Sequence, residues 1–226
     1  MIEDTRTTLQ NDLRDARRKG VAPSSSLRRH FYALARQVTR WADTLKPTGS
    51  HRGPAIGVTS IQSGAGKSTV SYNLAVALKS IATPPILLVE SDLGRHYITR
   101  KLGLARSPGL SELLLGEASI EETVFETPIT NLSILGSGRK SDQEALDLPF
   151  ENLGPIIEEH LDNFNYLVFD LPLASQLTTC QAIVPFLDGV ILTVEANQID
   201  RQQIKRVQQQ FKSNGIEIIG LVLNKA

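Results

Sequence analysis

Residues 55–69 read AIGVTSIQSGAGKST, and this stretch decides the fold. Ala55–Thr59 is a short apolar run that predicts a buried strand, and a helical pattern begins at Lys67. The loop between them holds Gly64 and Gly66, which let the backbone curl tightly because they lack a Cβ atom. The stretch therefore predicts a strand, a tight loop and a helix in direct succession.

The same alternation continues along the chain. Further strands are expected at Ile86–Glu90, Asn131–Leu135, Tyr166–Asp170, Gly189–Val194 and Glu217–Leu223. Helical stretches are expected over 67–81 and near 110–124, 149–161, 175–186 and 199–213. Strands that are apolar throughout are typical of parallel sheets buried on both faces, and their alternation with helices indicates βαβ units. We therefore predict a three-layer α/β fold with a mainly parallel sheet.

The first 52 residues differ from the rest in charge. The whole chain is neutral, with 24 Lys and Arg against 24 Asp and Glu, but residues 1–52 hold 11 basic and five acidic residues. Apolar side chains at a spacing of three or four residues predict an amphipathic helix over 27–45, after a polar stretch with a short helix and a linker. We divide the chain into a basic helical extension, 1–52, and a main domain, 53–226. The basic extension fits an acidic partner, an anionic membrane surface or simply a solvated helix face.

Composition excludes several classes of protein. With 226 residues, 41% of them apolar, the chain can form one sizeable core. Cys180 is the only cysteine, which excludes a disulfide framework. No apolar run reaches the roughly 18 residues of a membrane-spanning helix, and the first residues lack the apolar segment of a secretory signal. The four histidines show no metal-ligand spacing. Because the chain has one cysteine, no secretory signal and no membrane-spanning run, we expect a cytoplasmic protein.

The loop at 63–69 has the chemistry of a phosphate-binding site. Successive backbone N–H groups and the start of a helix both favour an anion. Lys67 is expected to reach the β and γ phosphates, the Ser68 hydroxyl to bind Mg²⁺, and Thr69 to lie near the α phosphate. The strict motif has glycine where this chain has Ile61, so the match is approximate. The nucleotide-binding candidates in this loop are Ser63, Gly64, Ala65, Gly66, Lys67, Ser68 and Thr69.

Acidic residues follow two of the expected strands. Asp170 ends one strand, and Glu90 and Asp92 lie at the end of another. In a parallel sheet these ends share one edge with the phosphate loop. Asp170 is a candidate for holding Mg²⁺ through water, while Glu90 and Asp92 are candidates for metal binding or for orienting a nucleophile. The alternative for each acid is that it only caps the next helix. Asn224 ends the last strand and is either an adenine contact or an ordinary turn residue.

From about residue 53 onward, the chain carries several motifs in the same order as the cytoplasmic domain of bacterial tyrosine kinases, and it resembles that domain. The similar family is the CpsD/CapB type of capsular and exopolysaccharide systems, within the MinD/ParA-like P-loop ATPases. Gln62 stands where MinD and ParA proteins carry an extra lysine, which favours the kinase branch. The motifs that carry the resemblance are the loop 59–69, Asn73-Leu74-Ala75, Glu90–His96, Gly109–Gly116, Asp170-Leu171-Pro172 and Leu223-Asn224-Lys225.

The resemblance implies a P-loop domain that binds ATP and Mg²⁺ and transfers the γ-phosphoryl group to protein tyrosine. Its catalytic residues would be Lys67, Asp92, Glu90 and Asp170, and its metal residues Ser68, Asp170 and Glu90. It also implies a transmembrane chain-length regulator as activator, recruitment by that partner to the inner face of the membrane, assembly with further copies of the chain, and no nucleic-acid partner.

The chain departs from the family at several points. Glu90 is one methylene longer than the expected aspartate, Gly94 replaces an arginine, and the four tyrosines are scattered rather than gathered in a tail. We therefore expect the accepting tyrosine to come from another chain, in trans. Two alternative functions stay open, a catalytically degenerate nucleotide-binding regulator of polysaccharide export and a MinD/ParA-like ATPase switch.

Overall fold

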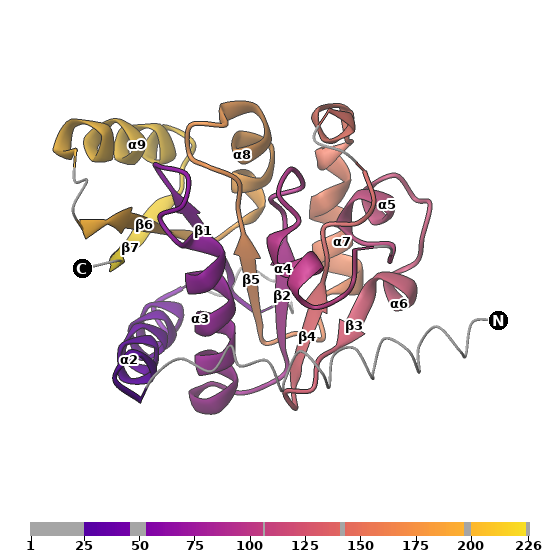
Figure 1. Cartoon of the computed structure of the whole chain (residues 1–226), viewed down its shortest axis with the longest axis horizontal. Coiled ribbons are helices and arrows are strands. Elements are labelled where there is room, and N and C mark those ends of the chain that lie inside the picture. The colour runs from indigo at the N-terminus through magenta and orange to yellow at the C-terminus, as the bar shows by residue number, and fades with distance from the viewer. Residues whose placement is uncertain (1–24, 46–52, 106, 141–142, 197–199, 225–226) are drawn as a thin grey trace.

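The computed structural model describes residues 25–45, 53–105, 107–140, 143–196 and 200–224, and is built on one seven-stranded sheet (Figure 1). The strands are β1 Ala55–Ser60, β2 Ile86–Glu90, β3 Val124–Glu126, β4 Leu132–Leu135, β5 Tyr166–Asp170, β6 Gly189–Glu195 and β7 Glu217–Asn224. Their order across the sheet is β3-β4-β2-β5-β1-β6-β7, and every pair is parallel except β3 with β4. The predicted α/β fold with a mainly parallel sheet is confirmed.

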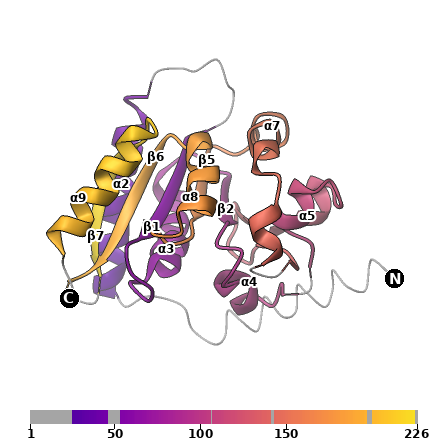
Figure 2. The same ribbon diagram turned by 90° about the horizontal axis from the view of Figure 1, so that it is seen from above.

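Helices cover both faces of the sheet and complete the three layers (Figures 1 and 2). Side chains of α2, α3 and α4 share one apolar cluster, and side chains of α5, α7, α8 and α9 share the cluster on the opposite face. The helices are α2 Ser25–Ala42, α3 Lys67–Ile81, α4 Tyr97–Lys101, α5 Leu110–Leu114, α6 Ile120–Thr123, α7 Leu153–His160, α8 Leu177–Ile183 and α9 Arg201–Ser213, with short 3₁₀ turns at 144–147, 150–152 and 184–186.

The helix expected near 110–124 is wrong over much of its length. The helix α5 ends at Leu114, Gly116 adopts a φ of 68°, and α6 is a single turn that leads into β3. A glycine with positive φ is a common way to end a helix, because other residues rarely adopt that conformation. The short elements α4 and β3 were not expected, since five and three residues are too few to show a periodic pattern.

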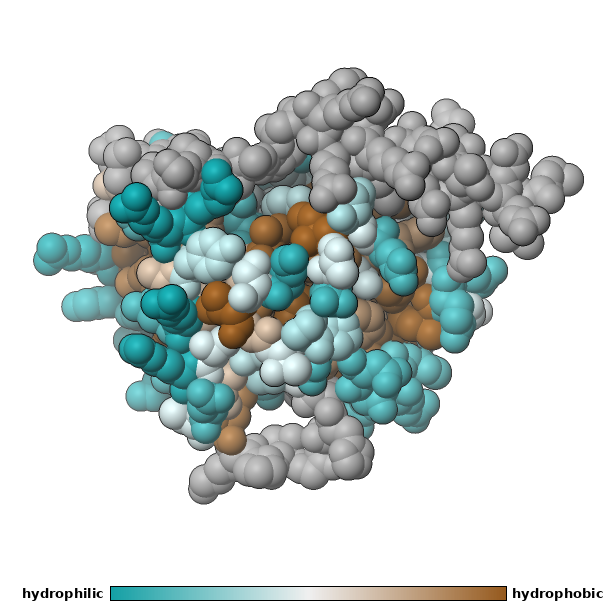
Figure 3. Space-filling view, turned by 90° about the horizontal axis from the view of Figure 1, so that it is seen from below, coloured by the Kyte–Doolittle hydropathy of each residue, from teal (hydrophilic) through white to brown (hydrophobic). Residues whose placement is uncertain are grey.

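The helix α2 packs against the main domain through its apolar face. Phe31, Ala35 and Val38 are buried in the same cluster as the apolar face of α3. A Cβ built on Gly189 would lie 2.7 Å from the Trp41 ring, so β6 and α2 are in close contact. Figure 3 shows hydrophilic side chains along the left edge, the side on which Figure 1 places α2. The short helix expected before residue 25 lies outside the described residues.

The strand order determines which residues can meet at the carboxyl edge of the sheet. The strand β5 lies between β1 and β2, and its last residue, Asp170, is in register with Glu90 of β2 and Val58 of β1. The phosphate loop follows β1 directly. The acids at the carboxyl ends of β2 and β5 are therefore brought to the loop by the sheet itself.

Candidate nucleotide and phosphoryl-transfer site

The phosphate loop has the backbone conformation that its glycines predict. Gly64 and Gly66 adopt φ angles of 82° and 89°, and α3 begins immediately after Gly66. A Cβ atom on Gly66 would also collide with the side-chain amide of Asn224. A residue other than glycine would therefore be strained at position 66 and would displace the Asn224 side chain.

Lys67 lies at the centre of a buried charged cluster. Its Nζ atom is 2.6 Å from Oδ2 of Asp92 and 3.6 Å from Oδ1 of Asp170, and the lysine side chain is only 5% exposed. The hydroxyl of Ser71 donates to the same Asp170 oxygen at 3.0 Å. Three of the expected catalytic residues, from α3, β5 and the loop after β2, are thus brought together.

Burial changes the proton affinity of Asp170. Desolvation raises the pKa of this carboxyl group from 3.8 to about 6, although the Lys67 charge and the Ser68 and Ser71 hydroxyls act in the opposite direction. A carboxyl group perturbed by burial beside a specific charged partner is typical of functional sites. At neutral pH Asp170 is still mainly ionised, and it can support a cation.

Glu90 does not take the place that we expected for a metal ligand. Its two carboxylate oxygens accept hydrogen bonds from the backbone N–H groups of Ile98 and Thr99, at 2.6 and 2.8 Å. The side chain therefore caps α4, which is the alternative that the sequence left open. Its extra methylene, relative to aspartate, adds length to the side chain that spans from β2 to α4. Burial raises the pKa of Glu90, and the hydrogen bonds from Thr99 and Ile98 oppose that effect.

Asn224 contacts the phosphate loop. Its side-chain Nδ2 donates to the carbonyl oxygen of Ala65 at 2.9 Å, so a hydrogen bond joins the end of β7 to the loop. An adenine contact by Asn224 stays a prediction. Ser63 and Thr69 are exposed, and Ser68 is partly exposed.

Several residues of the site were not expected from the sequence. Ser71 lies one turn after Lys67 on α3, and that spacing of four residues was the available signal. Ser91 donates to the backbone carbonyl of Asp170 at 2.9 Å and ties β2 to β5. Arg95 donates from Nη2 to the Ser63 hydroxyl at 2.7 Å. Ser137, which follows β4, lies 3.1 Å from the Thr99 hydroxyl, and no local pattern points to this contact.

The donor atoms at the site fit Mg²⁺. Ser68, Asp92 and Asp170 offer only oxygen, which this ion prefers, and Mg²⁺ is commonly held by one or two carboxylates together with substrate phosphates. Within the described residues, no group of three or more His, Cys, Asp or Glu side chains could hold a metal by itself. The site therefore suits an ion that arrives with a nucleotide.

Residues 54–216 match a protein family described as an AAA domain. The chain belongs to this family. It is 29% identical to the tyrosine-protein kinase CpsD of Streptococcus pneumoniae serotype 4. The 200 aligned residues cover 87% of this chain and 83% of that protein. Among solved structures, it is similar to the chimerical protein CapA2B2, with a TM-score of 0.75, 27% identity and coverage of 91% of this chain and 88% of that one. The cell division ATPase MinD of Pyrococcus furiosus gives a TM-score of 0.65 at 26% identity, over 76% of this chain and 71% of that one. These matches agree with the AAA-domain assignment, and they confirm the predicted resemblance to CpsD/CapB-type kinases within the MinD-like ATPases.

Proposed function

We propose that the protein is an ATP-dependent tyrosine kinase of capsular or exopolysaccharide biosynthesis, which transfers the γ-phosphoryl group to a tyrosine hydroxyl. The observation that carries the proposal is the buried cluster of Lys67, Asp92 and Asp170 beside a glycine loop that opens α3. The similarity to CpsD, a named tyrosine-protein kinase, supports this choice over a degenerate regulator or an ATPase switch.

Binding would begin at the phosphate loop. The N–H groups of residues 63–69 and the start of α3 would hold the phosphates, and Lys67 would turn from the carboxylates toward them. Ser68 and Asp170 would hold Mg²⁺, which supplies charge neutralisation when it is bound. Asn224 would keep the loop closed through its hydrogen bond to Ala65.

Asp92 would then act on the accepting tyrosine. In the structure its carboxylate is occupied by Lys67, at 2.6 Å. Once Lys67 turns to a phosphate, that carboxylate is free to accept the hydrogen bond of an incoming hydroxyl and to orient the oxygen for attack. Because phosphoryl transfer depends mainly on positioning and charge, the chain needs no further covalent chemistry.

The test is phosphoryl transfer by the pure protein. Labelled ATP and Mg²⁺ would be incubated with the full chain, alone and with tyrosine-bearing peptides, and phosphotyrosine would be measured. We expect Lys67→Ala to abolish nucleotide binding and transfer, Asp92→Asn to retain binding but lose transfer by about 100-fold, and Lys79→Ala, at the other end of α3, to match the wild type. Phosphate release without phosphotyrosine would instead indicate an ATPase switch, and binding without turnover a degenerate regulator.

We also propose that a transmembrane partner of the polysaccharide system recruits the chain to the inner face of the membrane and activates it. No helix in the described part of the chain combines the length and apolar character that crossing a bilayer needs. Fractionation of cells with and without that partner tests this point, and the protein should leave the membrane fraction when the partner is deleted.

A further inference from the structure

The buried cluster around Lys67 brings no excess of positive charge to the phosphate loop. Two carboxylates, Asp92 and Asp170, lie within 3.6 Å of the single ammonium group of Lys67. With both acids ionised, this cluster carries a net charge of −1. A nucleoside triphosphate is strongly anionic, and phosphoryl transfer is accelerated by cations around the transferred group. A second cation beside Lys67 would therefore have a clear electrostatic use.

Arg95 is a second cation at this loop, and it comes from a different part of the fold. Its Nη2 donates to the hydroxyl of Ser63, the first residue of the loop, at 2.7 Å. The Arg95 side chain is exposed, whereas Lys67 is buried beneath the loop. None of the ion pairs found within the described residues includes Arg95, so no carboxylate neutralises its charge there.

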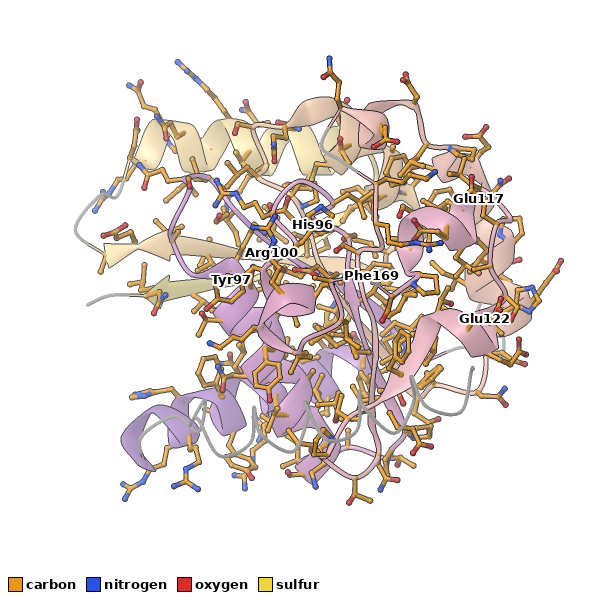
Figure 4. The ribbon with its side chains drawn as sticks, turned by 45° about the vertical axis from the view of Figure 1, so that its right-hand side comes forward. His96, Tyr97, Arg100, Glu117, Glu122 and Phe169 are labelled. Carbon is orange, nitrogen blue, oxygen red and sulfur yellow. The ribbon has the colours of Figure 1, made fainter. Side chains whose placement is uncertain are left out.

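The backbone around Arg95 is held firmly although its side chain is exposed. The N–H of Arg95 donates to the carbonyl oxygen of Asp92 at 3.2 Å, which places the arginine on the same turn as the acid that binds Lys67. The next residue, His96, lies 2.6 Å from Ser137 through Nδ1, and Glu90 caps the helix that follows. Figure 4 shows His96, Tyr97 and Arg100 gathered around this short helix, α4. A charge whose backbone is fixed beforehand costs little reorganisation when it acts.

We propose that Arg95 contacts the γ-phosphate of a bound nucleoside triphosphate, and that Ser63 holds its guanidinium group when no nucleotide is present. A guanidinium group can bind two phosphate oxygens at once, which suits it to a terminal phosphate. ADP lacks that phosphate. The contact would therefore make the protein favour the triphosphate over the diphosphate. The proposal rests on the part of the proposed function that places ATP at residues 63–69.

Calorimetry on the full chain tests the proposal without any need for kinase activity. A non-hydrolysable ATP analogue and ADP, each with Mg²⁺, would be titrated into wild type, Arg95→Ala, Arg95→Lys and Arg100→Ala. We expect Arg95→Ala to weaken analogue binding roughly tenfold and to leave ADP binding within about twofold. Arg95→Lys should recover part of the loss, and Arg100→Ala, an exposed arginine on α4, should bind both nucleotides like the wild type.

The remaining outcomes separate this inference from the proposed function. Equal weakening of analogue and ADP by Arg95→Ala, or no change in either, would overturn the γ-phosphate contact. Failure of Arg95→Lys to recover any binding, with thermal unfolding unchanged, would also count against it. If the analogue is discriminated as expected but no peptide is phosphorylated, the Arg95 contact stands and the kinase function is lost. A wild type that binds neither nucleotide would overturn both.

Discussion

At the scale of single residues, the site buries charged side chains, and their desolvation lowers the stability of the folded protein. Asp170 is fully buried, and its raised pKa shows that the folded protein favours the protonated carboxyl group relative to the unfolded chain. Retaining the charge at neutral pH therefore works against folding. A buried acid of this kind is explained by the cation and phosphates that the site is proposed to bind, because functional sites often lose stability for activity.

This cost predicts a pH dependence of stability. The folded pKa of Asp170 is about 6 and the ordinary value is 3.8, so the folded state binds more protons between those values. The contribution of Asp170 to the free energy of unfolding should therefore fall as the pH rises from about 4 to about 6. We expect Asp170→Asn to raise the free energy of unfolding at pH 7 by about 3 kcal/mol, and much less at pH 4. Urea denaturation in the presence of EDTA measures this, and pH profiles that stay parallel would contradict it.

Glu90 differs from Asp170 in its hydrogen bonds: burial raises its pKa too, but both of its carboxylate oxygens accept bonds from backbone N–H groups of α4. Glu90→Gln replaces one acceptor oxygen with an NH₂ group that faces the backbone N–H groups of α4. We expect the free energy of unfolding to fall by about 2 kcal/mol while binding of Mg-ADP changes little. The exposed Glu159→Gln is the matched control. Loss of Mg²⁺-dependent binding without a loss of stability would show that Glu90 is a metal residue after all.

At the scale of elements, α2 contributes to the core through one face and presents arginines on the other. Phe31 and Val38 are buried against the α3 side of the sheet, whereas Arg29, Arg36 and Arg40 are exposed. The apolar spacing of this helix was enough to predict both its presence and its buried face. Its packing against α3 and β6 makes the helix part of the main domain's core.

Trp41 tests whether α2 stabilises the domain. The Trp41 ring packs directly against Gly189, so any side chain at position 189 would collide with the ring. We expect Trp41→Ala to lower the free energy of unfolding by about 2–3 kcal/mol, because it leaves a cavity between α2 and β6. Arg36→Ala on the exposed face should change stability by less than about 0.5 kcal/mol. Chemical denaturation compares the two variants, and equal effects would show that α2 is not coupled to the core.

At the scale of the whole molecule, the sheet order joins the site to the core. The strands β1, β2 and β5 lie next to one another, and each contributes at its carboxyl end a loop or an acid of the site. A nucleotide bound there would contact three neighbouring segments at once. Binding should therefore stabilise the domain as a unit.

Ligand-induced stabilisation gives a direct measurement of this coupling. At 100 times the dissociation constant, a ligand that binds only the folded state adds about 2.7 kcal/mol. For a domain of this size we expect a non-hydrolysable ATP analogue with Mg²⁺ to raise the thermal midpoint by about 5–10 °C. The Lys67→Ala variant should show no rise. A midpoint that is unchanged in the wild type at saturating analogue would argue against nucleotide binding at this loop.

The sequence alone was sufficient to predict the layers of the fold and the meeting of Lys67, Asp92 and Asp170. The strands β2 and β5 and the helix α3 begin and end where the apolar patterns predict, because buried strands and a glycine loop leave strong local signals. Lys67, Asp92 and Asp170 could be expected to meet, since parallel strands bring their carboxyl ends to one edge.

Only the tertiary structure decided what the remaining polar groups do. Glu90 and Asp92 are two residues apart and chemically alike, yet one caps α4 and the other pairs with Lys67. The contacts of Arg95 with Ser63 and of Thr99 with Ser137 join segments that are far apart in the chain. Such roles depend on distances across the sheet edge, and a one-dimensional pattern contains no information about which of two neighbouring side chains turns toward which loop.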